Sequence, residues 1–338
     1  MKTNKIAMLI PLAACGLLSC SHDDTNGIAP SQKEVRFNVT VPRAPRGVTE
    51  TSTIDNFRIF SFVNKKPYMH NVSATKNDGS GWVTTPVMYW PADASPVNFY
   101  CISPMIGEVA DSDVPNPNIE NYDNATGKTD LLYSVNIGAT VNPVSINFRH
   151  ALSKVAFKFK RMEASSSQAP IKVDVSEVTL TAINTKGSFT YPDQTTSSET
   201  SNAGTWHDQG SRSDISIFNG PVATLTDQYT ALNSSGYEFA LPQELATSTA
   251  DLGGAYVKVK CAVYDETSGV RIWPKSAESD YLYFPLNSTG AANTTAEWQA
   301  GKAYAYNITV GVPQGSGKIE FDVTVDQYPT FEDMYLEQ

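Results

Sequence analysis

The chain contains few cysteines, with four among its 338 residues. Cys15 and Cys20 lie in the N-terminal segment, which leaves Cys101 and Cys261 for the rest of the chain. Both of these are surrounded by alternating apolar residues, a setting typical of a buried, unpaired thiol. A disulfide between them is the alternative, but it would have to join two regions that the strand pattern assigns to different domains.

Basic residues are also scarce. The chain has 25 Lys and Arg against 35 Asp and Glu, a formal net charge of −10. Removal of residues 1–20 would take Lys2 and Lys5 with it, leaving 23 basic residues against 35 acidic ones and a net charge of −12. Because nucleic-acid binding depends on neutralising phosphates with basic residues, we expect no nucleic-acid partner.

The chain also lacks a convincing transmembrane run, since the N-terminal apolar stretch Ile6–Leu18 is too short to span a bilayer. Lys2 and Lys5 precede this stretch and Ser19-Cys20 follows it, the order of a bacterial lipoprotein signal peptide. We therefore predict lipidation of Cys20 and anchoring to the outer membrane. Each methylene of the acyl chains that is buried in the membrane contributes about 0.8 kcal/mol to this anchoring. The alternative is an ordinary secretory signal with an incidental cysteine. With 41% hydrophobic and 18% charged residues, the chain suits two domains outside the membrane.

Helical periodicity is missing as well, and a period of two residues dominates. In the first half we predict strands at 35–41, 57–63, 82–90, 97–102, 131–137 and 144–148. In the second half we predict strands at 152–160, 173–183, 188–191, 237–241, 256–264, 281–286 and 304–310. Two such sets favour an all-β protein with two sandwiches, each sheet solvated on one face. We expect Gly107–Gly127 and Gln194–Ser213 to be loops.

Catalytic and metal-binding signatures are absent too. His150 has no partner Ser or Cys at motif spacing, and we expect it to form a hydrogen bond at the domain junction. His22, His70 and His207 are scattered and form no ligand cluster. The sequence does not display the carboxylate pair that a hydrolase would need. We predict that the chain is not an enzyme and binds neither a cofactor nor a metal.

Two segments with a period of two stand apart from these two sets and lie near opposite ends of the chain. The first is Val35–Val41, with Val35, Phe37, Val39 and Val41 on one face, and Arg43 and Arg46 follow it closely. The second is Ile319–Val325, and Ile319, Phe321, Val323 and Val325 share one of its faces. It is joined to the last sandwich strand by a Gly- and Ser-containing linker.

These two segments are near equivalents in length and chemistry, which suggests an exchange. Proteolysis at Arg43 or Arg46 would free the first strand and leave an apolar groove that the second strand of a neighbouring molecule could fill. Burying four such side chains contributes about 6 to 12 kcal/mol before ordering costs. Such a contact is heterologous and does not close, so it produces a filament. The alternative is that both segments are ordinary edge strands of one sheet.

Three segments carry a resemblance to a known family. They are Tyr89–Tyr100, Phe148–Val155 and Trp298–Val310, and together with the N-terminal signal they occur in the order found in that family. In this respect the chain resembles the fimbrillins, the FimA-like and Mfa-like subunits of type V pili. No single segment is diagnostic, but their joint order and spacing are fairly specific.

The resemblance implies two tandem transthyretin-like Greek-key β-sandwich domains, export as a lipoprotein, and removal of the N-terminal strand by an arginine-specific protease. Arg46 would be the cleavage residue, with Arg43 the second candidate. Polymerisation with other pilin subunits would follow by strand exchange, and the presence of both elements favours a stalk subunit in the fimbrium at the cell surface. The implied division is a signal at 1–20, a propeptide at 21–46, domains at 47–147 and 148–312, and a donor strand at 313–338.

A second function remains open on sequence grounds. Trp82, Trp90 and Trp206 lie near predicted loops, as they would in a tip adhesin or a surface lipoprotein that binds glycans or host proteins. We favour instead the interpretation that these tryptophans are core aromatics.

Overall fold

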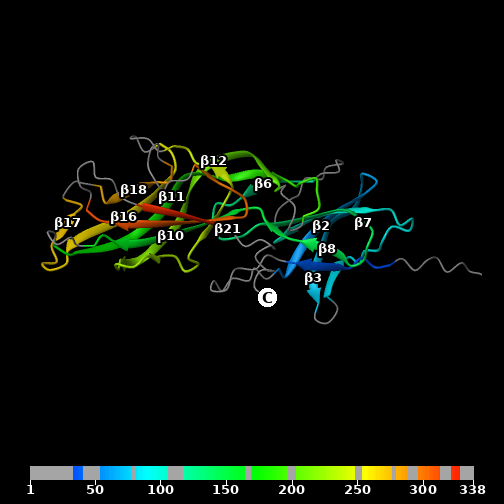
Figure 1. Cartoon of the computed structure of the whole chain (residues 1–338), viewed down its shortest axis with the longest axis horizontal. Coiled ribbons are helices and arrows are strands. Elements are labelled where there is room, and N and C mark those ends of the chain that lie inside the picture. The colour runs from blue at the N-terminus through cyan, green and yellow to red at the C-terminus, as the bar shows by residue number, and fades with distance from the viewer. Residues whose placement is uncertain are drawn as a thin grey trace, which may run out of the picture.

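The computed structural model describes residues 33–40, 54–77, 81–105, 117–163, 169–196, 203–247, 253–275, 279–287, 296–312 and 321–327. These residues form strands, turns and irregular segments, with no helix among them. The molecule is elongated, with the N-terminal strands at one end and the C-terminal half at the other (Figure 1). The prediction of an all-β fold is confirmed.

The N-terminal half is built on an eight-stranded sheet with the order β8-β1-β4-β3-β2-β5-β7-β9. Its strands are β1 (Phe37–Thr40), β2 (Asn56–Val63), β3 (Lys66–Asn77), β4 (Gly81–Thr85), β5 (Val97–Ser103), β7 (Leu132–Ala139), β8 (Val144–Asn147) and β9 (Arg149–His150). All the paired neighbours are antiparallel except β1 and β8, which run parallel. The first strand of the chain is therefore enclosed by two later ones.

The C-terminal half contains two larger sheets. One has the order β13-β10-β20-β21, with β14 also on β10; the other has the order β12-β11-β16-β17, with β18 on β16 and β6 on β11. Their strands are β6 (Asn118–Asp123), β10 (Ser153–Arg161), β11 (Ile171–Thr190), β12 (Thr205–Thr224), β13 (Thr230–Ala231), β14 (Glu238–Ala240), β16 (Tyr256–Asp265), β17 (Arg271–Trp273), β18 (Tyr281–Pro285), β20 (Lys302–Val310) and β21 (Phe321–Gln327). A short pair, β15 (Gln243–Glu244) with β19 (Glu297–Trp298), completes this half.

Alternation of apolar and polar residues explains how the two C-terminal sheets pack. In β10, Val155, Phe157 and Phe159 are buried while Lys158 is exposed, as the sequence pattern predicts. These side chains share one apolar cluster with inward-facing residues of β11, β16 and β20. Each of these sheets therefore has one face in the core and one face in water.

The eight-stranded sheet does not follow that rule. In β2 and β5, residues such as Phe57 and Phe99 join the N-terminal core, while residues on the opposite face, such as Phe60 and Tyr100, join a second cluster at the junction. The C-terminal half contributes Phe189 and other aromatics to this junction cluster. The expectation of one solvated face is wrong for these strands, because the end of the C-terminal half covers that face.

Several predicted boundaries are also wrong. The predicted loops Gly107–Gly127 and Gln194–Ser213 contain β6 and the first half of β12, β3 was not predicted, and β4 ends at Thr85 rather than Trp90. The predicted strands 173–183 and 188–191 are one strand, β11, interrupted by register shifts. β12 is rich in polar residues, so it lacks the apolar alternation that would predict a strand. Its backbone pairing with β11 holds it in place.

Candidate functional site: strand β1 and its groove

Strand β1 is held between β8 and the region around β4 by backbone hydrogen bonds on both sides. Along β8, the Val144 N–H donates to the Arg36 carbonyl at 2.7 Å and the Phe148 N–H donates to the Thr40 carbonyl at 3.0 Å. On the other side, the Val35 N–H donates to the Met88 carbonyl at 2.8 Å. β1 is thus an internal strand, and the alternative that it is an edge strand is wrong.

A second set of contacts fastens the residues just before β1. The Trp90 N–H donates to the Lys33 carbonyl at 2.8 Å. The Asn142 side chain accepts from the Arg36 N–H and donates to the Glu34 carbonyl, both at 2.8 Å. Sequence reasoning missed Asn142, since its position in the bend Val141–Pro143 gives no signal for a role in holding a distant strand.

Side chains of β1 and of Val35, two residues before it, fill an apolar groove. Val35 is 1% exposed and Phe37 is 6% exposed, and Val39 packs partly buried against the same cluster. The Phe37 ring meets the edges or faces of Phe57 and Phe99 with centroids 5.8 Å and 5.7 Å apart. Without β1, both aromatic rings would lose a neighbour, and the N–H groups of Val144 and Phe148 would lose their acceptors.

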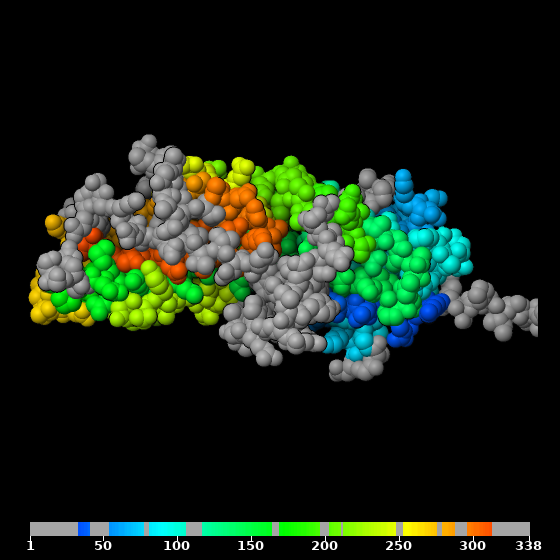
Figure 2. Space-filling model, viewed as in Figure 1, coloured from blue at the N-terminus to red at the C-terminus, as the bar shows by residue number. Residues whose placement is uncertain are grey.

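The groove is accessible along one side of the molecule. In Figure 2 the dark blue atoms of β1 reach the surface of the N-terminal half, next to the cyan and green atoms of later strands. Removal of the strand would therefore open the groove to solvent rather than leave a sealed cavity. Such an opening, with backbone groups unpaired on both sides, is suited to accept another strand.

The remaining predicted residues of this region are only partly covered by the structure. Cys20, Val41, Arg43 and Arg46 lie outside the described residues. β1 ends at Thr40, so Arg43 and Arg46 follow it closely in the sequence.

The C-terminal strand β21 lies in the other half of the molecule. It is the last strand of its sheet and pairs antiparallel with β20, where Phe321, Val323 and Val325 stand opposite Ile308, Tyr306 and Tyr304. Ile319 lies outside the described residues. The two terminal strands therefore belong to different sheets, and the alternative that they share one sheet is wrong.

The tryptophans considered for ligand binding take part in the core. Trp82 packs against Phe57 with ring centroids 4.9 Å apart, and Trp90 packs against Phe99 at 6.3 Å. The Trp206 indole donates to the Ala151 carbonyl at 2.7 Å and packs against the junction cluster. The three side chains are partly buried and pack against the cores, which supports the interpretation that they are core aromatics.

The cysteines and His150 also behave as structural residues. Cys101 and Cys261 are buried and form no disulfide, as predicted, and burial raises the pKa of the Cys261 thiol to about 12. Cys101 lies in the same cluster as Phe37. His150 Nδ1 is 2.6 Å from Asp130 Oδ2, close to the junction between the halves, which agrees with the predicted hydrogen bond.

Within the part of the chain that the structure describes, no group of three His, Cys, Asp or Glu residues is arranged to hold a metal ion. In the same residues no helix is long and apolar enough to cross a membrane.

The fold and the groove define a class: an elongated, all-β protein in which the first strand of the chain completes a sheet made of later segments. The chain belongs to the fimbrillin-like family, whose sequence profile matches residues 43–327. Among curated proteins, no sequence matches it significantly.

Solved structures show the same fold. A fimbrial protein from Bacteroides vulgatus ATCC 8482 is 15% identical, with a TM-score of 0.57 over 88% of this chain and 100% of the other. A fimbrilin (FimA) from Porphyromonas gingivalis W83 is 10% identical, with a TM-score of 0.48 over 90% of this chain and 99% of the other. At 15% identity, the likeness to the Bacteroides vulgatus protein concerns the fold alone.

Proposed function

We propose that this chain is a stalk subunit of a type V pilus at the cell surface, exported as a lipoprotein through Cys20. In this proposal an arginine-specific protease cuts after Arg46 or Arg43, β1 leaves, and the C-terminal strand of a neighbouring subunit takes its place. Membership of the fimbrillin-like family supports the pilus assignment. We further propose that the two halves are transthyretin-like Greek-key domains.

The observation that carries the proposal is the position of β1. A strand removed from a sheet edge would leave one unpaired edge, whereas removal of β1 from between β8 and β4 would leave two, together with the pocket of Phe37. Filling that gap restores a backbone ladder and buries apolar side chains worth about 1.5 to 3 kcal/mol each. Such an insertion would be slow to reverse, as a pilus requires.

The direction of the strands supports the same exchange. β10 begins just after β9, which belongs to the N-terminal sheet, and runs away from the junction; β20 is parallel to it and ends at Val310. If the chain continued in the direction of β20 past Val310, instead of turning back as β21, it would leave the molecule at the end formed by the C-terminal half. β1 runs toward the junction, because Thr40 accepts from the N–H of Phe148, the residue before β9.

A donor strand entering from the outer N-terminal end of the next subunit would consequently run in the same direction as β1 and parallel to β8. In that orientation the apolar pattern aligns without a gap, with Phe321 in the place of Phe37. Val323 and Val325 would then take the places of Val39 and Val41, and Ile319 that of Val35. The proposed register follows from this match.

Limited digestion with trypsin tests the proposal. The full precursor should be cut after Arg46 or Arg43, identified by the new N-terminus, and should then form SDS-resistant ladders and fibres. A chain truncated after Lys318 should be cut at the same place and stay monomeric. A cut full-length chain that remains monomeric, or ladders formed equally by the truncated chain, would contradict the exchange.

The alternative of a tip adhesin that binds through exposed tryptophans loses its sequence support, because the three tryptophans pack against the cores. We therefore propose no ligand for them.

A further inference from the structure

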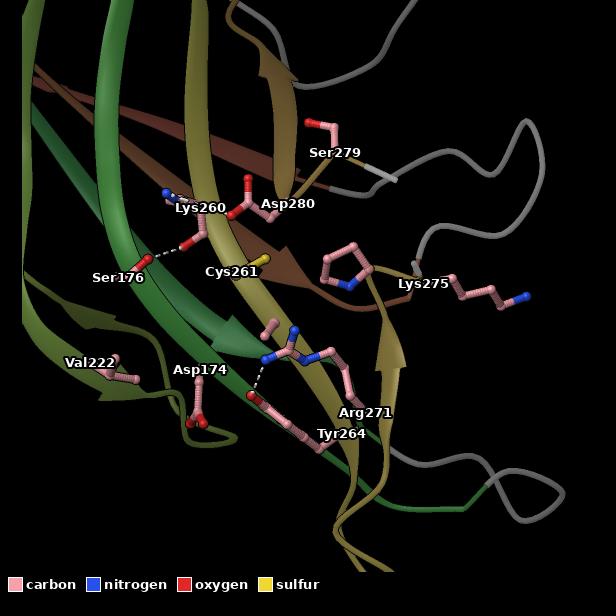
Figure 3. A pocket seen from close by; sticks show the side chains of 12 residues that line it. Asp174, Ser176, Val222, Lys260, Cys261, Tyr264, Arg271, Lys275, Ser279 and Asp280 are labelled. Carbon is pink, nitrogen blue, oxygen red and sulfur yellow. Dashed lines mark hydrogen bonds and ion pairs between the residues drawn. The ribbon is translucent and has the colours of Figure 1, made fainter. Parts of the chain in front are cut away.

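A hollow of about 1010 Å³ lies on the solvated face of the six-stranded sheet, which does not contain β1 (Figure 3). Its floor is β16, where the outward-facing residues Lys260 and Tyr264 flank the small Ala262. The short side chain of Ala262 leaves room between two long ones. The alternation of long and short side chains along β16 therefore forms the floor of the hollow.

Interrupted strand ladders widen the hollow on its other sides. Ser176 is the extra residue of a bulge in β11, since Val175 pairs with Cys261 and Glu177 pairs with Lys260. The ladder between β11 and β12 skips residues 220–222 near the same bulge, and β17 shifts register on β16 near Tyr264. Bulges of this kind often re-aim side chains next to binding sites.

The hollow is lined by both positively and negatively charged side chains. The Arg271 guanidinium points into it, and its Nη2 donates to the Tyr264 hydroxyl at 3.3 Å (Figure 3). No carboxylate of the described residues lies within ion-pair distance of Arg271. Lys260 Nζ is 3.6 Å from Asp280 on the opposite side. Asp174 adds a carboxylate that also pairs with Lys172 Nζ at 2.8 Å and accepts from the Thr224 hydroxyl at 2.6 Å. Ser176 adds a hydroxyl that donates to the Lys260 carbonyl at 3.5 Å.

These groups select the chemistry of a ligand. A guanidinium without an acidic partner binds a carboxylate through two parallel hydrogen bonds. Carboxylates and hydroxyls of the protein bind the hydroxyl groups of a sugar. Protein partners are anchored by apolar and aromatic side chains in buried pockets, and here the apolar contribution is small, with Val222 as its most exposed member.

We propose that this hollow binds a saccharide that carries a carboxylate, such as a sialic or uronic acid, with Arg271 holding the carboxylate and Asp174 and Ser176 binding sugar hydroxyls. The volume suits a ligand of two or three rings. In a chain with a formal net charge of −10, such a ligand is repelled by most of the surface, so binding is confined to this cationic position. The site does not depend on strand exchange.

Isothermal titration of the purified full-length chain tests the site. The probes are sialyllactose and a hyaluronan tetrasaccharide, each beside a counterpart without the carboxylate, lactose and the carboxyl-reduced tetrasaccharide. At least one acidic probe should bind saturably and more tightly than its neutral counterpart, and binding should weaken as salt is added. Arg271→Gln should weaken it about tenfold or more, since a charged hydrogen bond is lost.

Arg212→Gln is the matched control, because Arg212 is an exposed arginine of the same sheet on β12. It should leave affinity unchanged, and the thermal midpoints of both variants should equal that of the parent chain. Equal binding of acidic and neutral probes, no saturable binding, or full affinity in Arg271→Gln would overturn the proposal. Tighter binding of a glutamate-rich peptide than of either saccharide would overturn it in favour of a protein partner.

Discussion

At the scale of single residues, Phe37 has a central position in the N-terminal core. Its ring is 6% exposed and lies against Phe57 and Phe99. In the proposed exchange, its contribution belongs to the precursor and is lost when the strand leaves.

Phe37→Ala should destabilise the precursor by about 3 to 5 kcal/mol, because it creates a cavity among buried aromatics. Denaturant unfolding of the uncut chain measures this loss. After trypsin has removed residues up to Arg46, the parent and the variant become the same molecule and should behave identically. A variant precursor as stable as the parent would mean that β1 contributes little to the core.

Glu238 is a second residue with a measurable signature. Its side chain is 1% exposed, and Oε1 accepts from Lys128 Nζ and from Asn233 Nδ2 at 3.0 Å, while Oε2 has no hydrogen-bond partner among the described residues. Burial raises the pKa of this carboxyl above its ordinary value of 4.5, against the opposing effect of Lys128. The native state therefore binds this proton more tightly than the unfolded chain does.

It follows that Glu238 lowers native stability as the pH rises from its ordinary pKa through its raised folded pKa. Glu238→Gln should raise the thermal midpoint near neutral pH, and the gain should vanish as the pH falls below about the ordinary carboxyl pKa. Thermal melts of both chains across that pH range supply the comparison. A variant that is less stable at every pH would show that the Lys128 pair outweighs the cost of burial.

At the scale of elements, the strands with strict alternation were predictable from the sequence and the others were not. β10 has three buried apolar residues with lysines between them, so its position and orientation follow from the pattern alone. β3 carries a residue of positive φ, Asn71, between Met69 and Val72, which breaks the alternation of its buried residues. β12 and β6 are strands because β11 extends far enough to pair with them, a long-range effect that no local pattern records.

The candidate groove shows the same limit. The apolar face of Val35, Phe37 and Val39 was readable in the sequence, but the parallel pairing of β1 with β8 was not. That pairing depends on a segment more than one hundred residues later, Val144–Asn147. The backbone hydrogen bonds on both sides of β1, which make it an internal strand, could be found only in the structure.

Loss of β1 can be followed through the cysteines. Cys101 shares the apolar cluster of β1, whereas Cys261 lies in the C-terminal core, and burial raises the pKa of both thiols. After removal of β1, and before any strand replaces it, Cys101 should react with a maleimide at least tenfold faster, while Cys261 should keep its rate. Mass spectrometry of peptides from the labelled chain, lacking residues 1–20, gives both rates.

Two outcomes would contradict this account of the groove. Equal acceleration at Cys101 and Cys261 would indicate general loosening of the molecule. No acceleration at Cys101 would indicate that the groove closes by itself, so that no neighbour is needed to fill it.

At the scale of the whole molecule, the junction cluster makes the two halves one continuous body. Tyr100 and Tyr133 of the N-terminal sheet pack against Tyr191 with ring centroids 5.6 Å and 6.2 Å apart, and Phe189 lies 4.9 Å from Tyr133. A rigid junction fixes the direction from β1 at one end to the end of β20 at the other. Subunits joined through these ends would repeat one axial step, as a filament requires.

The most direct test of the strand exchange is a disulfide trap for its register. With Phe321 in the place of Phe37, Asp322 takes the place of Asn38 opposite Ser145 of the next subunit. Adjacent strands of a sheet bring such pairs to about 4.8 Å, within disulfide range. In the single chain, Asp322 stands opposite Asn307 instead.

A mixture of Asp322→Cys and Ser145→Cys chains, both lacking residues 1–20, should therefore form an intermolecular disulfide after trypsin treatment and not before it. Thr324→Cys with Ser145→Cys should not, because that pair is displaced by about 6.6 Å along the strand. Before cleavage, a single chain with Asp322→Cys and Asn307→Cys should link within itself. Failure of the intermolecular link after cleavage, with the internal link still formed, or equal linking by Thr324→Cys, would contradict the proposed exchange.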